Sequence, residues 1–509
     1  MLLWFVALYL LVSVAIGLYV ATRVHNTKDF AVAGRHLPLP VVTATVFATW
    51  FGAEAVFGAS ATFVRDGLRG VVADPFGSSM CLILAGIFFS RYLYKLNIIT
   101  LGDFYRMRYN RTVEVVTTLC IVASYLGWVA AQIKALGLIF NVVTDGEVAQ
   151  STGMILGAAI VLTYTTFGGM LSVAILDFIQ MAVSMGGLFY IASILADKTG
   201  GVATVIGHAS AAGKFEFFPP PDPLQWITFL GAWITMMLGS IPQQDVFQRI
   251  TSAKSARIAV AGSILGATIY FCFCFVPMFI AYSATIVDPG LYLPMLQSSE
   301  ADEYQRVLPM LVMAQTPLFA QVIFFGAVLS AIMSCSSATL LAPSVTFAEN
   351  ILKGIMPRMN DRQFLLLMRL TIVVFACIVL AFALNSKSSI FKMVENAYKV
   401  TLAGAFVPLV AGALWRRATT QGALAATFGG LLSWLLIELL VGDASPVPPQ
   451  LIGLAVSAAG MLIGSLLPQA IGGPVPVAPE HAFLHHHAAA ETHHVAEHPH
   501  HHPDAPGKR

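Results

Sequence analysis

The stretch Ala48-Thr49-Trp50-Phe51-Gly52-Ala53-Glu54, followed by Gly58, interrupts an apolar window that runs from Leu39 to Phe63. Glycine in the middle of such a window weakens a helix and frees backbone carbonyls. Lipid tolerates this only where the chain lies beside protein or a water-filled cavity. A second window, Leu224–Pro242, contains Gly231-Ala232-Trp233 and then Gly239-Ser240-Ile241-Pro242. Ordinary glycine packing between helices also explains either window alone. Together they predict two discontinuous helices at matching places in two halves of a chain with internal repeats.

The composition around these windows indicates a membrane protein. Of the 509 residues, 57% are hydrophobic and only 11% are charged, whereas soluble domains carry roughly 25% charged residues. The net charge of +2 argues against nucleic acid as a partner. Six cysteines lie in apolar windows without metal-ligand spacing. A lipid bilayer and a small molecule are the expected partners, and the oligomeric state stays open.

Apolar windows of about the length needed to cross a bilayer recur along the chain. We count thirteen and interpret the first as a retained span, because no basic region or cleavage site precedes it. The windows are Leu2–Thr22, Leu39–Phe63, Val71–Leu93, Val115–Val142, Gly153–Phe167, Met170–Ala196, Leu224–Pro242, Ala259–Tyr282, Pro317–Ala348, Leu365–Leu384, Val394–Trp415, Ala423–Val441 and Leu451–Leu467. Basic residues gather after the odd-numbered windows, which predicts an N-terminus outside and a C-terminus in the cytoplasm of an inner or plasma membrane.

Three spaced motifs resemble the sodium:solute symporter family. The first is Asp29-Phe30-Ala31-Val32-Ala33-Gly34-Arg35, and the second runs from Gly168-Gly169-Met170 to Asp177 and Gln180. The third is Gln248-Arg249 followed by Ala253-Lys254. The resemblance covers roughly Asp29 to Gly430, and the high-affinity choline transporter branch is the most similar part of the family.

This resemblance implies an all-α polytopic membrane protein with the LeuT-type fold, in which two inverted five-helix repeats alternate access to a central site. The expected parts are an extra N-terminal helix (1–22), two repeats (39–196 and 224–415), two further helices (423–467) and a disordered, histidine-rich cytoplasmic tail (468–509). The implied activity is sodium-coupled symport of a small organic solute. A sensor with the transporter fold and a passive channel are the alternatives. No nucleotide-binding loop, paired catalytic carboxylates or nucleophile–base arrangement indicates an enzyme.

Sodium is a hard cation that takes oxygen ligands. By resemblance, the family's sodium site corresponds to the carbonyls of Ala48, Phe51 and Ala331 and the side chain of Ser334. The next ligand position holds Cys335, whose thiol is a poor sodium ligand. Asp177 corresponds to a position on the ion's route to the cytoplasm, although an acid near a helix end also contacts interfacial water. Hydroxyls in span nine could equally bond to their own helix.

Aromatic faces attract quaternary ammonium groups, and Trp50 and Trp128 match cage positions of the choline branch. Where that branch has a third tryptophan, this chain has Gln243, followed by Gln244 and Asp245. Tyr125 and Gln132 are further candidates for the lining. The solute therefore stays open between a choline-like amine or betaine, an amino acid and a small carboxylate.

Two charged residues, Glu54 and Lys134, lie near the middle of spans expected to line the cavity. An unpaired charge there costs several kcal/mol, so the sequence predicts an ion pair between them. Alternatively, Glu54 meets an ammonium or Lys134 a carboxylate of the solute. In the tail, the run His485, His486 and His487 could bind a transition metal weakly.

Overall fold

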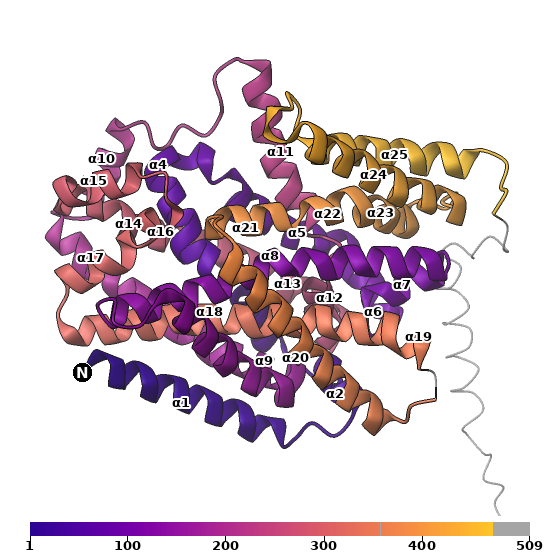
Figure 1. Cartoon of the computed structure of the whole chain (residues 1–509), viewed down its shortest axis with the longest axis horizontal. Helices are drawn as coiled ribbons and strands as arrows, with labels where there is room; N and C mark the ends of the chain where they lie inside the picture. The colour runs from indigo at the N-terminus through magenta and orange to yellow at the C-terminus, as the bar shows by residue number, and fades with distance from the viewer. Residues whose placement is uncertain (357, 472–509) are drawn as a thin grey trace, which may run out of the picture.

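A computed structural model describes residues 1–356 and 358–471. The described chain is a bundle of helices, most of which run along the horizontal axis of Figure 1. The N-terminus lies at the left end of this view and the last turn of the C-terminal helix α25 (Pro449–Leu466) at the right. The described chain therefore begins and ends at opposite ends of the bundle.

The first half of the chain contains, in order, α1 (Leu2–Ala21), α2 (Thr27–Val32), η1 (Ala33–Arg35), α3 (Leu39–Trp50), η2 (Glu54–Ala59), α4 (Ser60–Gly70), η3 (Val72–Gly77), α5 (Ser78–Leu84), η4 (Ala85–Ser90), α6 (Arg91–Lys95), α7 (Leu101–Arg108), α8 (Arg111–Val143), α9 (Gln150–Lys198), α10 (Val202–Ala211), α11 (Pro223–Gly239) and α12 (Gln244–Ser252). The second half contains α13 (Ala256–Phe273), α14 (Phe275–Val287), α15 (Pro289–Gln297), α16 (Ala301–Gln305), α17 (Val307–Gln315), α18 (Leu318–Phe347), η5 (Ala348–Leu352), α19 (Lys353–Ile355), α20 (Asp361–Asn385), α21 (Ile390–Ala397), α22 (Lys399–Thr401), η6 (Leu402–Phe406), α23 (Val407–Leu414), α24 (Thr420–Leu440), η7 (Gly442–Ala444) and α25.

The predicted membrane-spanning architecture is confirmed, but the predicted count of thirteen spans is not. Within the described residues, 10 helices are long and apolar enough to cross a membrane, or up to 12 if each of two bent pairs is one span. The difference from thirteen arises in α9, which contains two of the predicted windows. A straight helix of its 49 residues would be about 74 Å long, more than twice the bilayer core. Its course is interrupted at Gly169, where φ is 53° and ψ is −152°.

The two bent pairs are the two discontinuous helices that the sequence predicts. Helix α3 and the segment Glu54–Gly70 meet at an angle of 57°, and α11 and α12 meet at 42°. The first break lies at Phe51-Gly52-Ala53, as expected. The second falls at Ser240–Gln243, so Gly231 lies inside an intact helix.

The three family motifs, far apart in sequence, meet around residues 30–37. A Cβ atom at Gly169 would lie 2.5 Å from the Phe30 carbonyl oxygen, so only glycine permits this approach. Gln248 Nε2 donates to the Ala31 carbonyl at 3.1 Å. The Lys254 amide donates to the Leu37 carbonyl at 2.9 Å. These contacts hold the chain that enters α3 against α9 and against the segment that follows α12.

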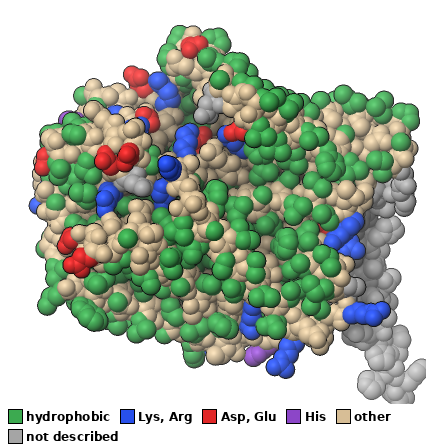
Figure 2. Space-filling view, viewed as in Figure 1, with side chains coloured by type: hydrophobic (Ala, Val, Ile, Leu, Met, Phe, Trp, Pro, Cys, Tyr) green, Lys and Arg blue, Asp and Glu red, His purple; other side chains and the backbone are tan. Residues whose placement is uncertain are grey.

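The surface agrees with a lipid environment. Figure 2 shows hydrophobic side chains over most of the visible face, with acidic groups gathered toward its left and upper parts. Large apolar residues on the outer helices are exposed, for example Leu432, Leu436 and Leu439 of α24. In water such a surface would be an aggregation hazard, whereas lipid tails accept it without cost.

Candidate functional site

The predicted ion-binding residues of α3, α9 and α18 lie together next to the first helix break. The Ser334 hydroxyl of α18 donates to the Ala48 carbonyl of α3 at 3.3 Å. The same hydroxyl bonds to one carboxylate oxygen of Asp177, which lies on α9 after the kink at Gly169. The other carboxylate oxygen of Asp177 accepts a bond from the Thr45 hydroxyl of α3. All four residues are buried, so this is an oxygen-rich cluster inside the bundle.

The remaining members of the predicted ion set border the same break. Phe51 is the residue at which α3 ends, and Ala331 lies one turn before Ser334 on α18. A Cβ atom at Gly52 would lie 2.7 Å from Cys335 Sγ and 2.6 Å from Gln132 Oε1. The Cys335 thiol and the Gln132 amide therefore pack directly against the broken backbone, and glycine is required there by close approach.

Gln132 of α8 explains part of the break itself. In a continuous helix the Ala53 amide would donate to the Thr49 carbonyl. It donates instead to Gln132 Oε1 at 2.8 Å, while Gln132 Nε2 donates to Glu54 Oε2 at 2.6 Å. The Gln132 side chain thus replaces the missing backbone acceptor of the Ala53 amide and also binds the Glu54 carboxylate.

The predicted ion pair between Glu54 and Lys134 is wrong. Glu54 accepts from Trp128 Nε1 at 3.0 Å and from Gln132, whereas Lys134 Nζ donates to the Ser388 carbonyl at 3.0 Å. Among the described residues these two charges form no salt bridge with each other. The reason is helical periodicity: residues two apart on α8 point about 200° away from each other, so Gln132 and Lys134 cannot both face Glu54.

Four buried aromatic side chains form a cluster beside Glu54. The Trp50 and Trp128 rings have centroids 5.2 Å apart and meet at 60°. Tyr398 stacks on Trp50 at 6.3 Å and contacts Trp128 edge-on at 5.8 Å. Tyr125 stacks on Trp128 at 5.9 Å. We call Trp50, Tyr125, Trp128 and Tyr398 the aromatic cluster.

A second buried carboxylate, Asp245, binds this cluster from the other broken helix. Its oxygens accept from Trp50 Nε1 at 3.1 Å and from the Tyr125 hydroxyl, and its amide donates to that hydroxyl at 2.9 Å. Each indole of the tryptophan pair thus binds a different carboxylate. The predicted residues Trp50, Trp128, Glu54 and Asp245 are therefore brought together.

Two neighbours of Asp245 point elsewhere. Gln243 bonds to the Ser124 hydroxyl at 2.9 Å and to the Thr401 hydroxyl at 3.4 Å. Gln244 accepts from the Leu101 amide at 2.8 Å and donates to the Ile99 carbonyl. Gln244 thus fastens the start of α12 to the loop before α7, outside the aromatic cluster.

Three residues that the sequence did not predict as site residues lie here: Thr45, Tyr398 and Arg249. Thr45 lies one turn before Ala48 on α3, a spacing that could have indicated it. No comparable signal marks Tyr398, which reaches the cluster from beyond α21. Arg249 was identified only as part of a motif. It is buried, and its Nη1 donates to the Asp245 carbonyl at 3.3 Å.

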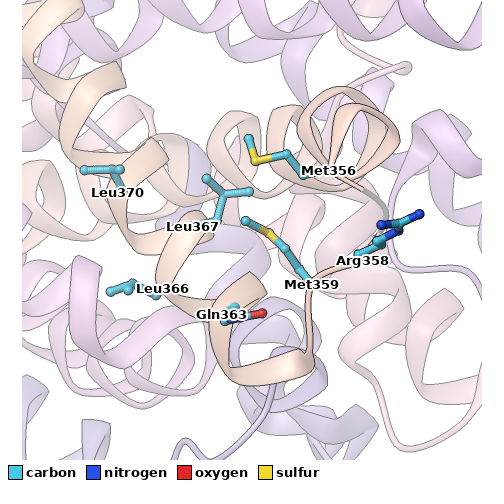
Figure 3. A pocket seen from close by; sticks show the side chains of 7 residues that line it. All are labelled: Met356, Arg358, Met359, Gln363, Leu366, Leu367 and Leu370. Carbon is cyan, nitrogen blue, oxygen red and sulfur yellow. The ribbon is translucent and has the colours of Figure 1, made fainter.

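A surface groove of about 570 Å³ lies away from this site, between the end of α19 and the first turns of α20. Figure 3 shows its lining of Met356, Arg358, Met359, Gln363, Leu366, Leu367 and Leu370. It contains no predicted site residue. The histidines proposed to bind metal, His485, His486 and His487, lie outside the described residues.

A model of the Sodium:solute symporter family matches residues 30–430, which is most of the chain. The chain belongs to the sodium:solute symporter family. As a member of this family of transporters, it couples sodium to the movement of a small solute across a membrane.

Named relatives of the symporter differ in their solutes. The human high affinity choline transporter 1 is 28% identical over 397 residues, covering 75% of this chain and 67% of the relative. The human sodium/iodide cotransporter is 25% identical over 497 residues, covering 91% of this chain and 75% of the relative. The osmoregulated proline transporter of Bacillus subtilis is 23% identical over 462 residues, covering 85% of this chain and 88% of the relative.

Solved structures establish the fold of the symporter. A Na⁺-coupled sialic acid symporter in a substrate-bound outward-open state has a TM-score of 0.78 at 18% identity, covering 91% of this chain and 97% of that one. A nucleobase-cation-symport-1 family transporter in a closed conformation has a TM-score of 0.57 at 15% identity, covering 87% of this chain and 94% of that one. These likenesses confirm the predicted LeuT-type fold.

Proposed function

We propose that this symporter carries a small organic cation together with sodium, and that the cation binds at the aromatic cluster between Glu54 and Asp245. The observation behind the proposal is the pair of indoles with centroids 5.2 Å apart, each bonded to a different buried carboxylate. Tryptophan faces attract cations, most strongly where water is excluded. Carboxylates beside them add a formal counter-charge.

Charge balance favours a cation over the other solutes that the sequence left open. Glu54 and Asp245 form no salt bridge with a described lysine, arginine or histidine side chain. The neighbouring guanidinium of Arg249 donates to the Asp245 backbone rather than to its carboxylate. Two buried carboxylates without a bonded cation would repel an anionic solute, whereas an ammonium group would offset one of the two negative charges. Choline-like amines are the first candidates, in keeping with the choline transporters among the relatives.

The proposed sodium ligands are the carbonyls of Ala48, Phe51 and Ala331 with the Ser334 hydroxyl. The oxygen atoms present suit a hard cation, since Ser334 already bonds to both the Ala48 carbonyl and Asp177. The Cys335 thiol contributes little, because sulfur is a soft ligand. Asp177 stands beside the ion and adds negative charge, a role more direct than the route to the cytoplasm expected from the sequence.

Solute entry requires the cluster to open. Rings in mutual contact leave no room for an ammonium group between them, and residues of both broken helices bind one another across the site. We propose that α3 and α12 move relative to α8 and α18 as access alternates, with their breaks serving as hinges. Sodium bound between α3 and α18 would bias this movement.

Uptake into proteoliposomes with an imposed sodium gradient tests this function. We expect sodium-driven accumulation of a choline-like amine, and no accumulation of small carboxylates. The variant Trp50→Leu should abolish accumulation, whereas the control Trp226→Leu, outside the aromatic cluster, should retain it. Movement only down the solute gradient would indicate a channel, and sodium-dependent binding without transport would indicate a sensor. Preferential accumulation of a carboxylate would refute the cation assignment.

The proposed orientation keeps the N-terminus outside and the C-terminus in the cytoplasm. It is supported by the charge asymmetry of the loops and by the position of the described chain ends at opposite ends of the bundle (Figure 1). A protease-cleavable tag at each terminus of the protein in intact cells would test it. External protease should remove the N-terminal tag and leave the C-terminal tag, and the reverse result would overturn the orientation.

A further inference from the structure

A third acidic side chain, Asp74, lies buried in the short segment η3 at the start of a membrane span. Its Oδ1 accepts from the Ser78 hydroxyl and from the Tyr270 hydroxyl of α13, both at 2.5 Å. The residue is 1% exposed. Its φ of −138° and ψ of 119° are not helical, so the regular backbone hydrogen bonding is interrupted there. Such an interruption leaves carbonyl oxygens available as ligands.

The other carboxylate oxygen of Asp74, Oδ2, is buried and has no hydrogen-bond partner among the described residues. Within the same part of the chain, no lysine, arginine or histidine forms a salt bridge with it. Two hydroxyl donors bind Oδ1, but no described cation pairs with the carboxylate, and a buried charge without a paired cation costs several kcal/mol. Segment η2 packs against η3, and Glu54 is close enough to Asp74 for the two carboxylates to interact electrostatically. Glu54 therefore adds negative charge at this position.

This position is separate from the proposed sodium site at Ser334. Tyr270 contacts Phe47 and Phe51 edge-on, with centroids 6.4 Å apart in both cases. Phe47 lies about 200° around α3 from Thr45, which bonds to Asp177. Tyr270, which binds Asp74, and Asp177 therefore contact different faces of α3.

We propose that Asp74 binds a second sodium ion, with Oδ2 as its charged ligand and the hydroxyl oxygens of Ser78 and Tyr270 as neutral ligands. These are hard oxygen donors of the type that an alkali cation takes. The ion would neutralise the buried carboxylate and reduce its repulsion with Glu54. The inference goes beyond the proposed function, because it holds whichever solute the protein carries.

Direct binding of ²²Na⁺ to the purified full-length protein in detergent tests the site without any solute. We expect the wild-type protein to bind more than one sodium ion per chain at saturation. Asp74→Asn should lose about half of the saturable sodium, while Asp66→Asn, an exposed carboxylate on the preceding helix, should bind as the wild type does. Ser334→Ala should weaken binding of the other portion, so that its half-saturating sodium rises about tenfold or more. Unchanged stoichiometry and half-saturating sodium in Asp74→Asn would overturn the proposal.

Two further variants keep the proposal testable if Asp74→Asn does not fold. Tyr270→Phe and Ser78→Ala keep the carboxylate and remove one proposed neutral ligand each, so half-saturating sodium should rise several-fold in both. Wild-type affinity in both variants would contradict the ligand set. If Asp74→Asn instead keeps all sodium binding, Asp74 is not a ligand and the sodium proposal is refuted.

Discussion

Trp128 Nε1 donates a 3.0 Å hydrogen bond to Glu54 Oε1 and so joins the middle of α8 to the first residue after the break of α3. This bond makes the glutamate part of the aromatic cluster rather than part of an ion pair. Glu54→Gln should therefore weaken apparent affinity for the transported cation at least tenfold, since hydrogen bonds to charged groups contribute about 1.5–3 kcal/mol. Sodium-driven uptake at a range of solute concentrations measures it.

The variant Lys134→Met is the control for Glu54→Gln, because it removes the other charge of the predicted ion pair. Because Lys134 donates to the Ser388 carbonyl, we expect its loss to change apparent solute affinity by less than about threefold, with any larger effect in thermal stability. A double variant with better uptake than Glu54→Gln alone would show that the two charges interact after all.

Tyr125→Phe removes the hydroxyl that both donates to the Asp245 carboxylate and accepts from its amide. The ring stacked on Trp128 remains, so the change isolates the polar contact. We expect apparent solute affinity to fall about tenfold, because the orientation of Asp245 is lost. Tyr190→Phe, at a partly exposed ring on α9, should have no effect, and an equal loss in both variants would argue against a role for Asp245.

The sodium dependence of uptake should respond in opposite directions to changes at two adjacent residues of α18. Ser334→Ala removes the hydroxyl bonded to Ala48 and Asp177, and half-saturating sodium should rise about tenfold or more. Cys335→Ser replaces a soft ligand by a hard one, and half-saturating sodium should fall. If Cys335→Ser leaves sodium dependence unchanged, residue 335 is not a ligand.

Gly52→Ala should impair folding or transport severely. The added Cβ would lie 2.6 Å from Gln132 Oε1 and 2.7 Å from Cys335 Sγ, so at least one site residue must move. We expect a loss of about 1–3 kcal/mol in stability from this overpacking. Gly186→Ala, also helical but with nothing within 4 Å of the new Cβ, is the control and should be neutral or slightly stabilising in thermal unfolding.

The membrane-spanning architecture and the first helix break were predictable from the sequence because both depend on local chemistry. An apolar run of about 20 residues can bury its backbone in lipid only as a helix, and glycine beside a charge in such a run marks where the helix stops. Two bent pairs are found, and the first is interrupted at Gly52. The candidate site residues Trp50, Trp128 and Ser334 were also indicated, through the resemblance of their positions to those of the family. The count of thirteen is not confirmed, because two of the predicted windows lie in the single 49-residue helix α9, which is interrupted between them at Gly169.

Which side chains face one another depends on the tertiary structure. Gln132 and Lys134 are two residues apart, yet the turn of α8 sends one to Glu54 and the other to the Ser388 carbonyl. The side chains of Tyr398 and Trp50 come from elements more than 300 residues apart and stack in the same cluster. The physical reason is that periodicity determines the angle of a residue around its own helix, whereas its partner depends on how separate helices are rotated and placed in the bundle.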